Sequence, residues 1–340
     1  MTRLGSLLAT LVLALAACGG DDSGSAGTTT SADVETIQVG LITDAGQLND
    51  RGFNELAYKG LKRAMKQPGI EGRVIESKSA NEYIPNMTVL ARRGYDLIIG
   101  VGFAQGDAIN TAATKFPDTK FVIIDVDQAS LKNKPANVVG MLFREEEAGY
   151  LAGYLAALAA QRKGGKPVLG TVGGFKEPPV DRFIAGYQAA AKDVLPNAEL
   201  LNGYSSDWED QAKCKELALN QIARGAQVVF QVAGGCGLGA LDAARERKIW
   251  GIGVDADQSF LGPHVLTSAM KRVDEGVFRT IMDVQDGKWQ GGRNVTYGLA
   301  DKGVALGTIS AQVPAEDRAK LEEQSKKIAA GEVEIPRSLG

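Results

Sequence analysis

The chain has 340 residues, which suggests two domains or one large α/β unit, and 44% of its residues are hydrophobic and 23% charged. This composition is close to the average for globular proteins, and it excludes a disordered chain and a protein with several membrane spans. The net charge is −3, no block of lysines and arginines stands out and there is one histidine, His264, so we expect no nucleic-acid partner, no histidine-based metal site and no histidine-dependent triad.

The first 18 residues are typical of an exported lipoprotein. Arg3 precedes an apolar run over 7–17, which is shorter than the roughly 20 residues that a membrane span needs and therefore fits a signal peptide. The run ends in Leu-Ala-Ala-Cys18, which resembles the bacterial lipobox, where the cysteine is lipidated and becomes the first mature residue. An ordinary secretory signal with an incidental cysteine is the alternative.

The segment that follows Cys18 is rich in Gly, Ser, Thr and Asp, so we expect a flexible tether over 19–35. A signal peptide over 1–18 and this tether predict a globular body that the lipid holds at the cell membrane, facing the periplasm or the cell exterior.

From Ile37 onward, short apolar runs alternate with stretches of helical periodicity, which predicts parallel sheets covered by helices on both faces. The predicted strands are Ile37–Thr43, Arg73–Ser77, Leu97–Val101, Phe121–Asp125, Val138–Leu142, Val168–Val172, Glu199–Tyr204, Val228–Val232, Ile249–Asp255 and Val265–Ala269.

An internal duplication divides these elements into two sets. At a constant offset of 130 residues, the Asp-x-Asp-Gln motif at 125–128 recurs at 255–258, and the segment 96–106 matches 226–236. Two generic βα arrays could share hydrophobic matches, but not this motif in the same register. The sequence therefore predicts two similar doubly wound α/β lobes.

The helical pattern over 145–162 begins with three glutamates at the positive end of the predicted helix dipole. We expect it to be the first helix of the second lobe, with its Ala/Gly stripe packed closely against the sheet. The chain after Thr267 is expected to cross to the first lobe and return, which makes a hinge with a ligand cleft between the lobes. The predicted bounds are 36–143 plus about 270–300 for the N-terminal lobe and 144–269 plus about 301–335 for the C-terminal lobe.

Open parallel sheets bind ligands beyond the carboxyl ends of their strands. After the first strand these positions hold Asp44, Asn49, Asp50 and Phe53, all candidates for ligand contact. Asp50 is also expected to cap the following helix. Phe53 fits the core and the cleft equally well from its position alone.

Asp125 and Asp255 end the duplicated strands, one in each lobe. Each could cap the next turn, or offer an acceptor to hydroxyl or amine donors of a ligand. Two facing carboxylates are also typical of glycosidases, but that chemistry needs one carboxyl group with a raised pKa.

The glycine-rich segment after residue 233 contains Gly235-x-Gly237-x-x-Ala240, which fits a relaxed dinucleotide fingerprint. Three observations oppose NAD binding: the preceding strand is the third of its lobe, the duplicated segment lacks the pattern, and an exported lipoprotein has little access to NAD. The glycines are better explained by backbone amides that approach a ligand at a helix N-terminus. No cofactor is therefore expected.

Other candidates lie in the second lobe. Trp208 stands in a polar loop, which favours a stacking role over a core role. Cys214 and Cys236 both fall near the carboxyl ends of strands, where they either form a disulfide that braces the rim of the cleft or remain free thiols. Lys271 is either a cation in the cleft or a solvated lysine.

In order and spacing, several segments resemble the basic membrane protein family, the nucleoside-receptor lipoproteins that feed ABC transporters. The resemblance covers Ile37 to about Gly307. Its carriers are Thr43-Asp44-x-Gly46, Asp50-x-x-Phe53-Asn54, Phe116-Pro117, Phe121–Asp125, Gly149–Gly153, Phe183-x-x-Gly186-Tyr187, Gln231–Gly235, Gly253–Gln258 and Met270-Lys271-Arg272.

The resemblance implies a type I periplasmic-binding-protein fold, two α/β lobes joined by a hinge that close on a purine nucleoside. It implies that Phe53 and Trp208 sandwich the base, where relatives more often carry phenylalanine at the second position. Asp44 and Asp125 would then contact base or ribose. The resemblance also implies that the ribose hydroxyls are held by Asp255, by Lys271 and by the backbone of Gly234 and Gly235.

The function expected from this resemblance is a monomeric binding protein, not an enzyme, that delivers purine nucleosides to an ABC permease and its ATPase. Trp208 and the pair Cys214 and Cys236 depart from the usual family pattern, which leaves the base preference open. Two alternatives remain: the same fold binding a sugar or another small ligand, and an exported carboxylate-dependent hydrolase.

Overall fold

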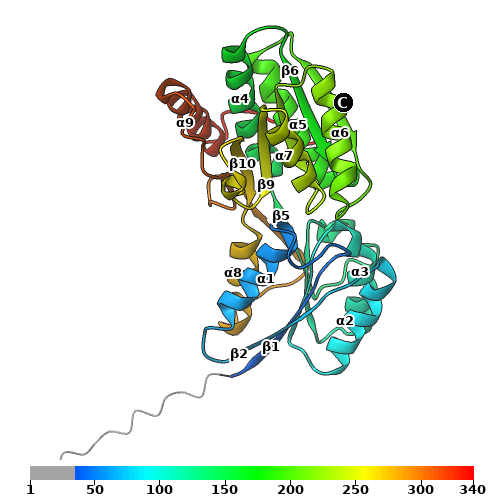
Figure 1. The fold of residues 1–340 in the computed structure, drawn as a ribbon. Helices are drawn as coiled ribbons and strands as arrows, with labels where there is room; N and C mark the ends of the chain where they lie inside the picture. The colour runs from blue at the N-terminus through cyan, green and yellow to red at the C-terminus, as the bar shows by residue number, and fades with distance from the viewer. Residues whose placement is uncertain (1–34) are drawn as a thin grey trace, which may run out of the picture. The chain divides into compact units, whose positions relative to one another are not determined.

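The computed structural model describes residues 35–340. The predicted signal peptide, the tether up to residue 34 and Cys18 lie outside the described residues. The described chain contains two six-stranded sheets, each the centre of one α/β lobe (Figure 1).

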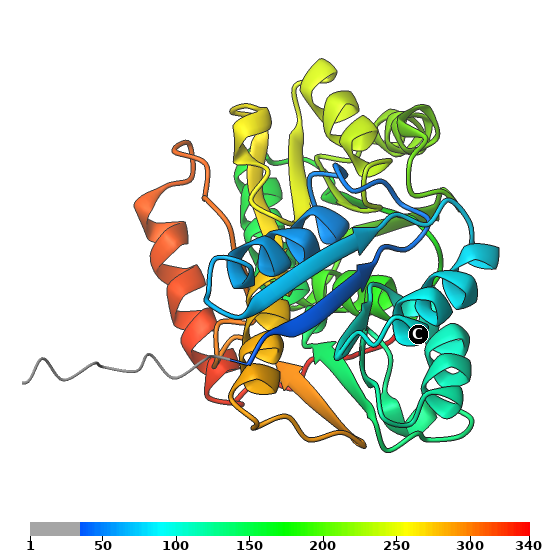
Figure 2. The same ribbon diagram turned by 90° about the horizontal axis from the view of Figure 1, so that it is seen from below.

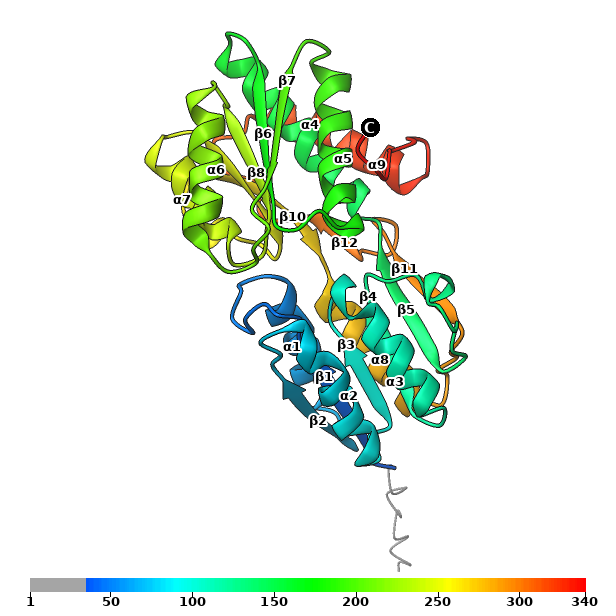
Figure 3. The same cartoon turned by 90° about the vertical axis from the view of Figure 1, so that its right-hand side faces the viewer.

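The sheet of the N-terminal lobe is parallel throughout and has the order β11-β5-β4-β3-β1-β2. One pair of helices, α1 and α8, covers one face, and α2 and α3 cover the other (Figures 2 and 3). The strands are β1 (Ile37–Ile42), β2 (Ile70–Ile75), β3 (Leu97–Gly100), β4 (Lys120–Ile124), β5 (Val138–Phe143) and β11 (Arg293–Tyr297). The helices are α1 (Phe53–Ala64), α2 (Tyr83–Arg92), α3 (Gly106–Lys115) and α8 (Val273–Gln285).

The sheet of the C-terminal lobe has the matching order β12-β10-β9-β8-β6-β7, but its edge strand β12 is antiparallel to β10. Helices α6 and α7 cover one face and α4 and α5 the other, with α9 against α4 (Figure 3). The strands are β6 (Val168–Gly173), β7 (Glu199–Tyr204), β8 (Val228–Val232), β9 (Trp250–Asp255), β10 (Val265–Lys271) and β12 (Val304–Leu306). The helices are α4 (Glu145–Lys163), α5 (Pro178–Val194), α6 (Gln211–Ala223), α7 (Gly237–Glu246) and α9 (Ala315–Ala329).

The central strands are apolar along their whole length because both of their faces are buried. In β4, Phe121 and Ile123 pack under α2 and α3, whereas Val122 and Ile124 face the opposite core. Every predicted strand is present, although β2 begins three residues earlier than predicted. Strands β11 and β12 were not predicted: β11 is a partly exposed edge strand without an apolar run, and β12 is an edge strand of three residues.

The duplication is visible in the backbone as well as in the strand order. Asp125 and Asp255 both have left-handed backbones, with φ of 74° and 62°, a region that few residues other than glycine, Asn and Asp adopt. Two residues later, the carboxylates of Asp127 and Asp257 accept backbone N–H groups at 2.8 and 3.1 Å, and a short 3-10 helix follows each of them within two residues. The repeated motif thus turns the chain sharply at the end of β4 and again at the end of β9, at the first aspartate of each copy.

Three segments connect the lobes: the junctions of β5 with α4, of β10 with α8, and of β11 with β12 (Figure 3). This is the crossing and return expected for the chain after Thr267. The residue bounds given above for each lobe stay a prediction.

Helix α4 does pack against the sheet, but the prediction is wrong for the glycines of the stripe, because they face another helix. A Cβ atom on Gly149 or Gly153 would collide with the carbonyl groups of Phe183 and Tyr187 in α5, and one on Gly186 would collide with α4. The small residues therefore allow two helix backbones to touch, which fixes the position of α5. Within residues 35–340, none of the helices has the length and hydropathy that a membrane span requires.

Candidate functional site

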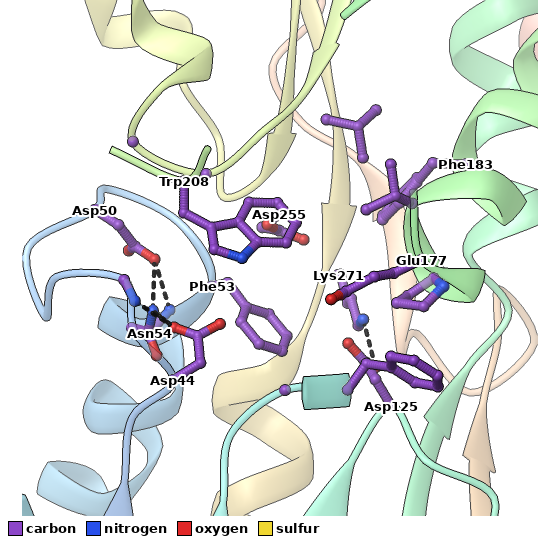
Figure 4. Close-up of a pocket in the computed structure, with 18 residues that line it drawn as sticks. Asp44, Asp50, Phe53, Asn54, Asp125, Glu177, Phe183, Trp208, Asp255 and Lys271 are labelled. Carbon is purple, nitrogen blue, oxygen red and sulfur yellow. Dashed lines mark hydrogen bonds and ion pairs between the residues drawn. The ribbon is translucent and has the colours of Figure 1, made fainter. Parts of the chain in front are cut away.

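A cavity that is partly open to solvent lies at the carboxyl ends of both sheets (Figure 4). Every residue predicted to bind the ligand lines it, with the exception of Asn49. Asn49 is exposed in the turn before the helix-capping residue Asp50. The duplicated strand ends thus converge on one space, as the strand-end rule predicts.

Two aromatic rings from different lobes reach this cavity. Phe53, the first residue of α1, comes from the N-terminal lobe, and Trp208 comes from the loop between β7 and α6 (Figure 4). The structure therefore places Phe53 in the cleft, the alternative that its position in the sequence left open. The ring of Phe175 packs against the indole of Trp208 in a tilted arrangement, with 5.3 Å between the ring centroids.

The loop that carries Trp208 is fastened at several points. A Cβ atom on Gly174 would collide with the indole ring, so only glycine lets the ring lie directly on this backbone. The backbone N–H of Cys236 donates to the carbonyl of Trp208 at 2.9 Å. A disulfide joins Cys236 to Cys214 in α6, with a Cα–Cα distance of 5.6 Å, and both residues are buried.

Of the two glycines that resemble a dinucleotide fingerprint, Gly237 serves packing instead. A Cβ atom on Gly237 would collide with the side chain of Gln231. The neighbouring Gly234 and Gly235 face the carbonyl of Trp208 and line the cavity with bare backbone. Internal packing thus accounts for a glycine that the fingerprint assigns to a bound pyrophosphate.

On the N-terminal side, Asp50 performs the expected capping role. Its carboxylate accepts the backbone N–H groups of Gly52, Asn54 and Glu55 at 2.9, 2.8 and 3.2 Å. Burial raises the pKa of Asp50, although these hydrogen bonds to its charged form oppose the change. Asp50 is therefore committed to the start of α1 even though it borders the cavity.

Asp44 is held on one side only. Its Oδ1 accepts from the backbone of Gly46 and from Nδ2 of Asn54, both at 2.8 Å. No residue of the described range donates to its Oδ2, which remains available to a ligand. Burial raises the pKa of Asp44 to about 6, against the opposing effect of Asn54 and Gly46.

Lys271 ends β10 at the junction of the lobes and is 2% exposed. Its Nζ lies 2.6 Å from Asp125 of the N-terminal lobe and 2.9 Å from Glu145 at the start of α4. Burial alone lowers the pKa of Lys271, but Asp125, Glu145 and Asp255 outweigh burial and hold that pKa above its usual range. Lys271 is therefore a buried cation, 5.0 Å from the ring centroid of Phe53.

Two carboxylates of the C-terminal lobe, Asp255 and Glu177, receive no hydrogen bond and no ion pair within 4.0 Å from any described residue, unlike Asp50 and Asp125. Burial raises the pKa of Asp255 to about 7; Lys271 opposes this change, and Asp50 and Asp125 add to it. Burial also raises the pKa of Glu177 to about 7, with contributions from Asp44 and Asp125. Both groups are acceptors that a ligand can still use.

Glu177 was not among the predicted site residues, although the sequence contains a signal for it. Its loop follows β6, the duplicate of β1, and so occupies the same kind of strand end as Asp44. Asn54 stood in the recognised motif but was not assigned to the site. The other lining residues that were not predicted are Gly46, Gly102, Phe103, Pro179, Val180, Phe183 and Val232.

The site thus combines aromatic faces with many carboxylates and the buried cation Lys271. Flat apolar rings favour a planar ligand. Carboxylates accept hydrogen bonds from hydroxyl and N–H groups and repel anions. The arrangement suits an uncharged planar molecule with several donor groups at its edges.

Comparison with known proteins agrees with this geometry. Residues 37–338 match the family described as ABC transporter substrate-binding protein PnrA-like. The ABC transporter nucleoside-binding protein BmpA of Lactococcus lactis subsp. cremoris is 33% identical over 96% of this chain and 95% of that protein. An uncharacterized lipoprotein of Pyrococcus abyssi is 33% identical over 89% of this chain and 77% of that protein. Among solved structures, an ABC transporter solute-binding protein from Aeropyrum pernix K1 has a TM-score of 0.81 and 26% identity, over 89% of this chain and 94% of that one.

Proposed function

Because the chain belongs to the PnrA-like family of ABC transporter substrate-binding proteins, we propose that it captures purine nucleosides between its two lobes and delivers them to a membrane permease. The membership confirms the resemblance seen in the sequence, and the likeness to the Aeropyrum pernix protein confirms the type I periplasmic-binding-protein fold. We further infer that Cys18 carries the lipid that holds the protein at the membrane.

The observation that supports this ligand best is the pair of rings, Phe53 and Trp208, from opposite lobes. Stacking of a base on an aromatic side chain contributes about 1–3 kcal/mol, and every base has a face to stack. A ligand between these rings contacts both lobes at once and therefore favours their closed arrangement.

The polar lining supports the sugar part of the ligand. Asp255, which receives no hydrogen bond from the described residues, and the bare backbone of Gly234 and Gly235 line the same cavity, which supports a role for them in binding the ribose hydroxyls. Hydrogen bonds to charged groups contribute about 1.5–3 kcal/mol each. Because carboxylates outnumber Lys271 in the lining, a phosphate group is repelled, so nucleosides are favoured over nucleotides.

Two alternatives are a sugar ligand in the same cavity and a hydrolase that uses a carboxyl group. A sugar ring can also stack on Trp208 and use the same carboxylates. A hydrolase needs a carboxyl group with a raised pKa, a property that Asp255 has. Burial in a binding cavity explains this pKa without catalysis, and the similar proteins of Lactococcus lactis and Aeropyrum pernix are named as binding proteins.

Isothermal titration calorimetry of the full chain in detergent tests the proposal, after unfolding and refolding to remove bound ligand. The titrants are adenosine, guanosine, inosine, uridine, AMP, ribose and glucose. Tight binding of purine nucleosides, with AMP much weaker, supports the proposal. Binding of sugars alone overturns the ligand, and release of free base from a nucleoside would reveal a hydrolase.

A further inference from the structure

Residues 45–52, here called the strap, connect β1 to α1 and line the cavity with Gly46 and Asp50 (Figure 4). At the start of the strap, the backbone N–H of Ala45 donates to the hydroxyl group of Tyr83 in α2 at 3.0 Å. At its end, the carboxylate of Asp50 caps α1. The N-terminal lobe therefore holds the strap at both of its ends.

The strap also contacts two different loops of the C-terminal lobe. Nε2 of Gln47 donates to Oε2 of Glu209, in the loop between β7 and α6, at 3.4 Å. The carbonyl of Arg51 accepts from Nε2 of Gln258 at 3.3 Å, and its guanidinium carbon lies over the ring of Phe260, 5.4 Å from the ring centroid. A cation at this distance from the face of an aromatic ring is attracted to it. Arg51 thus makes two of the contacts that bridge the lobes.

The duplicated motif shows that this contact between the lobes belongs to the second copy. In the first copy, Gln128 donates from Nε2 to the carbonyl of Pro135 at 3.1 Å, within its own lobe. Gln258 is buried, and its Oε1 accepts from Nε2 of Gln231 at 2.8 Å, which fixes the amide with its Nε2 directed at Arg51. The same motif thus serves its own lobe in one copy and contacts the opposite lobe in the other.

The contacts of Arg51 lie close to Asp255 but outside the binding cavity. A Cβ atom on Gly52 would lie 3.7 Å from Oδ2 of Asp255, so the end of the strap runs next to this carboxylate. Arg51 and Phe260 themselves line a separate groove, and Phe260 is 59% exposed. Substitution of these two side chains therefore leaves the lining of the binding cavity unchanged.

We propose that Arg51 and Phe260 are positioning residues that hold the strap against the C-terminal lobe and thereby set the rate at which a ligand leaves the cavity. This inference rests on the proposed function, because it needs a ligand enclosed between the lobes. The lobes cannot separate at the strap without breaking the contacts of Arg51 with Gln258 and Phe260. Loss of these contacts should therefore speed ligand release and change the association rate little.

The test measures the dissociation rate of a purine nucleoside by stopped-flow tryptophan fluorescence, using the refolded full chain in detergent. Phe260→Leu keeps an apolar side chain but removes the aromatic face. We expect it to raise the dissociation rate about two- to fivefold, the range that an exposed cation–π contact provides. Phe260→Tyr keeps the face and should keep the rate. Arg51→Asn removes the guanidinium, suits the left-handed backbone of this residue (φ of 54°) and should raise the rate by a similar factor.

A double-mutant cycle tests whether the two side chains act through one contact. Arg51→Asn combined with Phe260→Leu should release the ligand no faster than the faster of the two single variants. The matched control is Phe278→Leu, which removes an aromatic face 3.7 Å from the guanidinium carbon of Arg63. Both of these residues belong to the N-terminal lobe, so the rate should not change. An unchanged rate in Phe260→Leu, or effects that multiply in the double variant, overturns this inference while nucleoside binding stands.

A measurement on the ligand-free protein separates this inference from the proposed function. Hydrogen–deuterium exchange of the backbone amides of residues 45–52 should be faster in Phe260→Leu than in the unmodified chain, and unchanged in Phe278→Leu. Unchanged exchange in Phe260→Leu overturns the inference whichever ligand binds. Absence of binding to every nucleoside overturns the proposed function alone, and the exchange result then decides whether these residues hold the strap.

Discussion

Replacing Asp255 by Asn should stabilise the empty protein while it weakens nucleoside binding. Asp255 is 8% exposed and no described residue donates a hydrogen bond to its carboxylate. Burial raises its pKa from 3.8 to about 7, partly opposed by Lys271. The folded state therefore holds a proton in the range between these values that the unfolded state has already lost, and stability falls as the pH rises through this range.

The size of the effect on the free energy of unfolding follows from the change in the pKa of Asp255 on folding. One pKa unit corresponds to about 1.36 kcal/mol, so a change of about 3 units gives an upper limit of about 4 kcal/mol above pH 7. The Asn side chain has the same shape and no charge, and Lys271 keeps its closer partners Asp125 and Glu145. We therefore expect Asp255→Asn to be more stable than the unmodified chain by about 2–4 kcal/mol at pH 8, and by clearly less at pH 5.

The assay is urea unfolding of both ligand-free proteins at pH 5 and pH 8, followed by tryptophan fluorescence. Asp257→Asn is the matched control, two residues away. Burial raises the pKa of Asp257, but hydrogen bonds from Thr308 and Ser259 outweigh burial and lower that pKa overall, so the control should be destabilised at pH 8. Equal or reduced stability of Asp255→Asn at pH 8 would refute the reasoning that this carboxylate is held in the fold at an energetic cost.

Further predictions concern the ring, the disulfide and the anchor. Trp208→Ala should weaken nucleoside binding about 10- to 100-fold, in keeping with about 1–3 kcal/mol of stacking, whereas Trp208→Phe should retain most of the affinity in calorimetry; equal losses in both would argue against stacking. Replacing Cys214 and Cys236 by Ser should lower the unfolding free energy by about 3 kcal/mol, since the bridge closes a loop with a separation of 22 residues; insensitivity of urea unfolding to a reductant would contradict this. Cys18→Ala should move the protein from the membrane to the soluble fraction on cell fractionation, and retention at the membrane would disprove lipid anchoring through this residue.

The two lobes could be predicted because buried parallel strands leave a strong pattern. Their faces are both covered, so each strand is a run of apolar residues, and the duplicated Asp-x-Asp-Gln motif sets the register between the two arrays. The edge strand β11 was not predicted because a partly exposed strand needs no apolar run, and β12 was not predicted because a run of three apolar residues is too short to indicate a strand.

The small residues of α4 indicated that another element packs closely against this helix, but not which element it is. Gly149 and Gly153 allow either a sheet or a helix to come near, and only the fold shows that α5 lies opposite. Lys271 posed a similar problem. A lysine at a strand end is usually solvated, and its burial here depends on Asp125 and Glu145, which come from different segments of the chain.

The sequence alone determined the fold class, the two-lobed organisation and half of the residues that line the cavity, because strand ends in parallel sheets have a fixed relation to ligand sites. Only the tertiary structure decided which carboxylates are already occupied by protein donors and which remain free. Asp50 is committed to a helix cap and Asp125 to Lys271, whereas Asp255 and Glu177 are not. This difference arises from partners far apart in the chain, and the burial and charge that set the pKa of each group exist only once those segments are brought together.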